Sequence, residues 1–179
     1  MSTSARPTPP RDALDATPVL PGGFCFVGLA WIPATSKNVQ EPERVLLLQL
    51  TDASVPQGSR YQLPGGEAQS PEPDWKSMQW HVWRTTGLEV TPTAILGQDW
   101  PVRPPAPGLP MVYRTIYLCE PVAAGTRVTL PGGEPGLVAH RWVSRDEGAA
   151  LMRGEGERAW FYGLWDAWGR SASAVQAAP

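Results

Sequence analysis

The sequence predicts one α/β domain (α+β in the order of its elements), with a mixed β-sheet between helices. Two apolar runs, residues 22–32 and 44–50, are rich in aliphatic and aromatic residues and are typical of buried strands. A helix, further strands and two C-terminal helices are expected to follow. Sheets and helices in this order bury their apolar faces against one another. The chain of 179 residues is long enough for one domain with a sizeable core.

Turn-rich segments separate the predicted strands. Pro33–Glu43 predicts a polar loop, and Thr51–Arg60 predicts a connection that leads through Tyr61–Leu63 into a tight turn. That turn, Pro64-Gly65-Gly66, needs backbone torsions that only Gly adopts at low cost. Gly97–Pro110 holds five prolines and predicts a stiff surface loop. The other predicted strands are Glu89–Leu96, Met111–Glu120, Val128–Leu130 and Ala139–Val143.

An amphipathic helix is predicted from about Pro73 to Gly87. Pro is favoured in a first helical turn because its missing N–H costs nothing there, and Asp74 complements the positive end of the helix dipole. Gly87 is a natural C-terminal cap. One face of this helix carries Trp75, Met78 and Val82 and is the expected core face; another carries Ser77, His81, Arg84 and Thr85, flanked by Trp80 and Trp83.

Two further helices are predicted near the C-terminus. Ser144 can cap a helix over Arg145–Met152, with Glu147 at capping-box spacing. Glu157–Gly169 predicts a last helix that is rich in aromatic residues. The expected domain covers residues 22–170, between a mobile N-terminal arm over residues 1–21 and a frayed tail over residues 171–179.

Composition excludes several classes of function. The net charge of −2 provides no basis for general nucleic-acid or membrane binding. Cys25 and Cys119 each lie in an apolar run without a C-x-x-C motif, which predicts buried free thiols in a reducing compartment. No apolar stretch is long enough to span a membrane, and the N-terminus lacks an apolar signal core. We therefore expect a cytoplasmic protein.

Residues 63–88, LPGGEAQSPEPDWKSMQWHVWRTTGL, resemble the signature box of the Nudix hydrolases. That box reads Gly, five residues, Glu, seven residues, then Arg-Glu-apolar-x-Glu-Glu-x-Gly-apolar. The positions that match are Gly66, Glu72, Val82, Gly87 and Leu88. The segments RVLLLQLTD, TGLEV, YRTIYLCE and AHRWVSRDE also resemble the usual Nudix progression, and the resemblance spans residues 24–168. It implies a Nudix-like α/β/α sandwich.

The resemblance also implies hydrolysis of a nucleoside diphosphate linked to another moiety, with Mg²⁺ or Mn²⁺. Such hard ions neutralise phosphate charge and activate a water, and glutamates three and four residues apart hold them on one helical face. The box is degenerate here, because Trp80, His81, Arg84 and Thr85 stand where the family has Arg, Glu, Glu and Glu.

The substituted positions are poor ligands for a hard metal ion. His81 would bind Mg²⁺ weakly. The cation at Arg84 would repel it, because like unit charges about 4 Å apart cost about 4 kcal/mol at an effective dielectric near 20, and a divalent ion doubles this cost. We expect no metal site and no cofactor; if a metal does bind, the candidate ligands are Gly65, Glu67 and Glu72.

Three functional interpretations follow. In the first, a Nudix-fold protein that lacks or is impaired in Mg²⁺-dependent pyrophosphohydrolase activity binds a nucleotide or nucleoside-diphosphate derivative, with guanidinium replacing metal charge. The alternative is an active hydrolase that uses non-standard acids, with Glu72 as the catalytic candidate and Mg²⁺ or Mn²⁺ as cofactor. The third is a subunit interface formed by the aromatic C-terminal helix and the Pro-rich loop, which would make a homodimer. The candidate ligand-binding residues are Gly65, Gly66, His81, Arg84 and Thr85. Two simpler alternatives remain open: Arg84 only pairs with Glu72, and His81 has no functional role.

Overall fold

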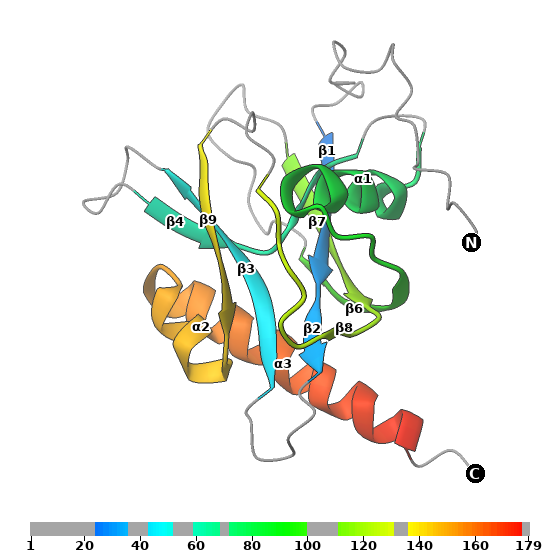
Figure 1. The fold of residues 1–179 in the computed structure, drawn as a ribbon, viewed down its shortest axis with the longest axis vertical. Coiled ribbons are helices and arrows are strands. Elements are labelled where there is room, and N and C mark those ends of the chain that lie inside the picture. The colour runs from blue at the N-terminus through cyan, green and yellow to red at the C-terminus, as the bar shows by residue number, and fades with distance from the viewer. Residues whose placement is uncertain are drawn as a thin grey trace.

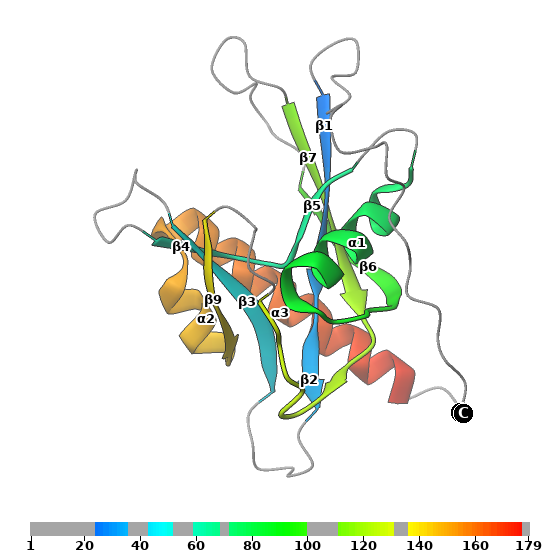
Figure 2. The same ribbon diagram turned by 45° about the horizontal axis from the view of Figure 1, so that its top comes forward.

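The computed structural model describes residues 24–35, 43–51, 59–68, 72–99, 111–130 and 136–176, with side chains as far as Ser171. The predicted N-terminal arm and residues 100–110 of the predicted Pro-rich loop lie outside these ranges. Within them, two mixed sheets stand between helix α1 on one side and helices α2 and α3 on the other (Figures 1 and 2). The predicted class, an α/β/α arrangement with mixed β-structure, is confirmed.

The first sheet has the strand order β5-β1-β7-β6. β1 (Phe24–Trp31) runs parallel to β7 (Met111–Cys119) and antiparallel to β5 (Gly65–Glu67), and β6 (Pro92–Asp99) pairs antiparallel with β7 at the edge. Side chains alternate across a strand. Even-numbered positions of β1 therefore face α1, whereas odd-numbered positions face α3.

The second sheet is built on β3 (Arg44–Thr51), which pairs antiparallel with three strands. These are β2 (Pro33–Thr35), β4 (Ser59–Gln62) and β9 (Leu137–Val143). The short strand β8 (Val122–Ala123) extends the sheet in parallel with β2.

Several predicted strand boundaries are wrong. Pro33–Thr35 is a strand although Pro33–Glu43 was predicted to be a loop, because β3 supplies a pairing edge. β6 begins at Pro92 instead of Glu89 and takes in residues 97–99 of the predicted Pro-rich loop. Val128–Leu130 forms no strand: Val128 is buried beneath α1, and the Thr129 N–H donates to the Thr86 carbonyl. The short strands β5 and β8 and the start of β4 at Ser59 were not predicted.

Helix α1 (Asp74–Thr86) has the predicted limits, with Pro73 at its N-cap and Gly87 in the left-handed conformation at its C-cap (φ 71°). Met78 and Val82 are fully buried as predicted. Trp75 is 36% exposed, so its assignment to the core face is wrong. Part of the face predicted to be polar is turned inward as well: Ser77 and Thr85 on it are buried, whereas His81 and Arg84 are partly exposed.

The two C-terminal helices lie together under the other face of the sheets (Figure 1). Helix α2 (Arg145–Leu151) has the predicted capping box, in which the Ser144 N–H donates to Glu147 Oε2 over 2.9 Å. Helix α3 (Gly154–Gln176) is longer than the predicted Glu157–Gly169 and continues into the expected frayed tail. Its glycines at 163 and 169 are exposed and do not break it.

Two buried clusters hold these layers together. The larger one joins both sheets to α2 and α3 around Trp31, whose ring centroid is 5.5 Å from those of Phe161 and Trp165 and 5.9 Å from that of Trp168. The aromatic residues of α3 are thus used mainly for internal packing. The smaller cluster lies under α1 and includes Ile32, Leu46, Met78 and Val82. No helix in the described part of the chain is long and apolar enough to cross a membrane.

The aromatic cluster gives a stability prediction. Phe161→Ala should lower the free energy of unfolding by about 3–5 kcal/mol, because it leaves a cavity beside Trp31. Phe26, which is 42% exposed, provides the matched control, and Phe26→Ala should cost less than half as much. Urea denaturation of both variants measures the difference; equal losses would show that the cluster is not the centre of the core.

The capping box gives a pH prediction. The hydrogen bond from the Ser144 backbone is the largest of the effects that lower the pKa of Glu147. The resulting stabilisation is complete above the unfolded Glu pKa of about 4.3 and is lost as pH falls through the lower folded pKa. The melting temperature of Glu147→Gln should therefore lie below that of the unmodified protein at pH 7 and approach it under acid conditions. Glu120→Gln, at an exposed position, should show no such convergence.

Candidate functional site

The Gly65-Gly66 turn packs directly against helix α1. Gly65 has a φ of 139°, which favours Gly, and Gly66 lies under the imidazole of His81. A Cβ added at Gly66 would come within 2.6 Å of the His81 ring atoms Cγ, Cδ2 and Nε2. The ring thus fills the space between the turn and the helix, and any larger residue at position 66 would have to displace it.

The polar side chains of this helical face make their contacts within the protein. His81 Nε2 lies 3.2 Å from the Glu67 carbonyl oxygen, at hydrogen-bond distance. The Thr85 hydroxyl donates to the His81 carbonyl over 2.7 Å and is buried. The guanidinium of Arg84 lies over the ring of Trp80, 5.0 Å from its centroid. Glu72 is exposed at the start of the helix.

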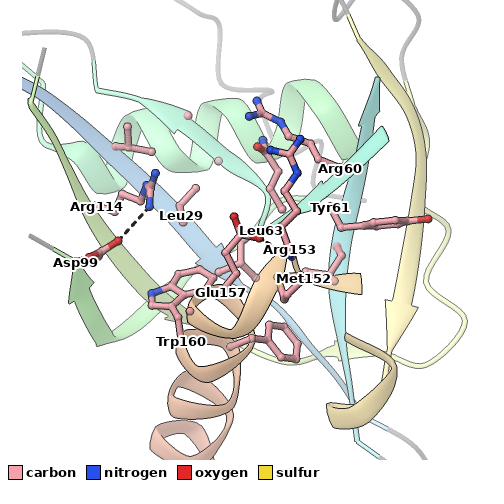
Figure 3. A pocket seen from close by; sticks show the side chains of 17 residues that line it. Leu29, Arg60, Tyr61, Leu63, Asp99, Arg114, Met152, Arg153, Glu157 and Trp160 are labelled. Atoms are coloured by element: carbon pink, nitrogen blue, oxygen red, sulfur yellow. Dashed lines mark hydrogen bonds and ion pairs between the residues drawn. The ribbon is translucent and has the colours of Figure 1, made fainter. Parts of the chain in front are cut away.

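A pocket of about 440 Å³ lies on the opposite face of the first sheet, against the start of α3 (Figure 3). Gly65 and Gly66 line it, so the Gly turn is a wall shared by helix α1 and the pocket. His81, Arg84, Thr85, Glu67 and Glu72 are not among its lining residues. The sequence-predicted site residues are therefore split: the glycines reach the pocket, and the helical side chains lie behind the turn.

The pocket combines an apolar floor with charged walls. Val27, Leu29, Leu47, Leu63, Met152 and Phe161 supply apolar surface, and Trp160 of α3 closes one side. Three arginines contribute positive charge: Arg60, Arg114 and Arg153. Two carboxylates partly offset it: Asp99 Oδ2 accepts from Arg114 Nη1 over 3.0 Å, and Glu157 Oε2 accepts from the Arg153 backbone N–H over 2.7 Å.

Sequence reasoning did not find these charged residues because they come from four segments that are far apart in the chain. Arg60 was assigned to a turn and Asp99 to a loop, and only the strand register Asp99↔Arg114 brings the ion pair together. One signal was visible. Arg114 interrupts the apolar residues of MVYRTIYLC, and a charge on the sheet face that otherwise enters the core marks a polar opening.

The thiol nearest the turn is not poised for nucleophilic chemistry. Burial, followed by the charge of Glu67 and a hydrogen bond to it, raises the pKa of Cys25 to about 11. The thiol is protonated at neutral pH, whereas nucleophilic attack requires a thiolate.

No group of three or more His, Cys, Asp or Glu side chains within the described ranges is placed to hold a metal ion. At the three positions where the Nudix resemblance expects metal ligands, the protein has an imidazole in van der Waals contact with the turn, a cation and a buried hydroxyl. These belong to His81, Arg84 and Thr85. This set of groups does not fit Mg²⁺ or Mn²⁺, which prefer several unengaged oxygen ligands.

Comparison of the fold with solved structures gives consistent matches. A MutT protein from Methanosarcina mazei Go1 matches with a TM-score of 0.60 and 21% identity, over 81% of this chain and 95% of that one. A C. elegans Ap4A hydrolase matches with a TM-score of 0.62 and 13% identity, over 84% and 98% of the two chains. The Nudix domain of Shewanella oneidensis NrtR, in complex with ADP ribose, matches with a TM-score of 0.61 and 11% identity, over 80% and 87%.

Sequence comparison alone finds no relative: no protein-family model matches the chain, and no curated protein does. The likeness to solved structures, by contrast, extends over most of the chain and most of each matched protein, with identities too low to carry more than the fold. The strands, the Gly turn and the helix after it lie as the resemblance in the sequence implied. The protein therefore has the fold of the Nudix hydrolases.

Proposed function

We propose that this protein binds a nucleotide or nucleoside-diphosphate derivative in the pocket beside the Gly turn, without a metal ion and without hydrolysing it. The observation that carries the proposal is the position of three arginines around an apolar pocket that the turn itself borders. Guanidinium groups pair well with phosphate oxygens because they offer a planar set of donors. They can supply the positive charge that a divalent ion supplies elsewhere.

The rest of the pocket suits the remainder of such a ligand. Trp160 presents an aromatic ring beside aliphatic side chains, and a base gains roughly 1–3 kcal/mol by stacking on such a ring. The volume of about 440 Å³ lies within the range of small-molecule sites, roughly 300–1,000 Å³. The NrtR Nudix domain was solved with ADP ribose, which supports a ligand of this class.

The absence of hydrolysis is inferred from the helical face behind the turn. The imidazole of His81 occupies the space over Gly66, and the Thr85 hydroxyl already donates to the His81 carbonyl. A metal ion at this place would have to displace the imidazole and would meet the cation of Arg84. We therefore assign His81 a structural role: it holds the turn to the helix.

Calorimetry tests the binding proposal. ADP, ADP-ribose, NAD and nucleoside triphosphates are titrated into the protein in EDTA, and at least one should bind. Arg153→Gln should weaken that binding by about tenfold, because a charge-assisted hydrogen bond contributes roughly 1.5–3 kcal/mol and tenfold corresponds to about 1.4 kcal/mol. The substitution leaves the backbone N–H of residue 153 in place, which donates a hydrogen bond to Glu157.

Arg158→Gln is the matched control, since Arg158 lies in α3 just after Arg153, is exposed and does not line the pocket. It should leave affinity within about twofold of the original, well below the effect of a lost charged hydrogen bond. Absence of heat for every nucleotide would contradict the proposal. Metal-dependent phosphate release that disappears in Glu72→Gln would instead favour the hydrolase alternative.

A double-mutant cycle tests the role of His81. Gly66→Ala should cost about 1–3 kcal/mol of stability, because the new methyl group overlaps the imidazole. In a His81→Ala background the same change should cost clearly less, with a coupling energy of about 1 kcal/mol or more. Urea denaturation of the four proteins measures both. An unchanged cost of Gly66→Ala in the two backgrounds would refute the packing role.

A further inference from the structure

The arginines of the pocket form two groups on different walls. Arg114 projects from β7 beside Asp99 of β6, whereas Arg60 comes from β4 and Arg153 from the start of α3 (Figure 3). In the figure, Arg60 and Arg153 extend toward the same side of the pocket, and the Arg114–Asp99 pair lies across from them. The positive charge is thus divided between two places.

Strand register shows how far Arg114 lies from the Gly turn. Val27 of β1 pairs with Glu67 of β5 on one side and with Arg114 of β7 on the other, and Arg114 pairs with Asp99. Neighbouring strands are about 4.8 Å apart, so the backbone at Arg114 stands roughly 10 Å from the strand that carries the turn. A contiguous diphosphate beside the turn and Arg60 leaves Arg114 available for a second group.

The surface between the two groups is largely apolar, with the carboxylate of Glu157 as its charged part. Leu29 of β1 lies on the sheet side and Trp160 on the α3 side (Figure 3), and Val27 of β1 also lines the pocket. Apolar and aromatic surface of this kind accepts a base and a sugar, not a phosphate. The order across the pocket is therefore cation, apolar surface with the Glu157 carboxylate on its α3 side, cation.

We propose that the preferred ligand is a nucleotide with two separate phosphate groups, one bound by Arg60 and Arg153 and the other by Arg114, with the nucleoside between them. This inference rests on the proposed function, because it assumes that the pocket binds a nucleotide. It goes further by naming Arg114 as the residue that selects separated over contiguous phosphates.

Asp99 is the partner that the second phosphate replaces. The Arg114–Asp99 pair is solvent-accessible, with side-chain exposures of 48% and 40%, and exposed ion pairs of this kind contribute little to stability. A phosphate offers Arg114 more acceptor oxygens and more charge than one carboxylate does. The exchange costs little, and Asp99 acts as an internal competitor that weakens binding of the second phosphate.

Two isomeric ligands isolate the effect of phosphate separation on affinity. ADP and adenosine 3′,5′-bisphosphate have the same base, sugar and number of phosphates, but the phosphates are contiguous in the first and separated in the second. Both are titrated in EDTA. The unmodified protein should bind the bisphosphate at least fivefold more tightly than ADP. The Arg114→Gln variant should bind both isomers with similar affinity, equal to that of the unmodified protein for ADP. Arg127 is exposed and lies outside the pocket, so the Arg127→Gln control should keep the preference for the bisphosphate.

Asp99→Asn provides the second arm. It should tighten the bisphosphate about threefold, as expected for removing a competitor worth less than 1 kcal/mol, and leave ADP within about twofold. Equal affinities of the two isomers for the unmodified protein would overturn the inference, as would a preference for the bisphosphate that survives Arg114→Gln. In either case, binding of ADP would leave the proposed function intact. If neither isomer nor any other nucleotide binds, both fail.

Discussion

The fold depends on one close contact, in which helix α1 lies directly on the glycines of the neighbouring strands. A Cβ at Gly28 would be 2.5 Å from the Asp74 carbonyl oxygen and 2.8 Å from Met78 Cβ, and a Cβ at Gly66 would meet His81. Only Gly allows this approach. It brings Met78 and Val82 into the smaller core cluster and sets the position of the turn that borders the pocket.

This contact also decides what chemistry the helix can offer. The His81 imidazole and the Thr85 hydroxyl are used for packing and for internal hydrogen bonds. Both groups stabilise the junction because polar groups in contact with a core need partners. The helical face on which the Nudix resemblance places metal ligands contributes packing and internal hydrogen bonds here, and the charged groups that line the pocket lie across the sheet.

The larger aromatic cluster positions the far wall of that pocket. Trp165 and Trp168 pack edge-on with ring centroids 5.2 Å apart, and both contact Trp31. Their burial holds α3 against the first sheet, where Leu164 approaches Gly97 of β6. Trp160 and Glu157, one and two turns further toward the N-terminus, are consequently presented to the pocket on a rigid element, which is how a binding site keeps its geometry.

Local patterns determined much of this protein. The Pro73 start, the Gly87 cap and the 3.6-residue spacing of Met78 and Val82 were sufficient to place α1, and the Ser144–Glu147 spacing placed the start of α2. These features depend on neighbours a few residues apart, which a sequence displays directly. Trp75 was misassigned because a helical wheel shows which residues share a face but not how much of the helix its neighbours cover.

Only the tertiary structure decided the candidate site. Arg60, Arg114 and Arg153 are far apart in the chain. Only Arg114 carries a local signal, because it interrupts an apolar strand, and that signal does not show what lies opposite it. Strand register sets Arg114 beside Asp99, and the packing of α3 brings Arg153 and Trp160 into the same pocket. Such long-range pairings depend on which face each strand turns inward, a choice made by the whole core. The sequence by itself identified the Gly turn and the helix behind it; the cationic pocket on the other side of that turn exists only once the two sheets and α3 are assembled.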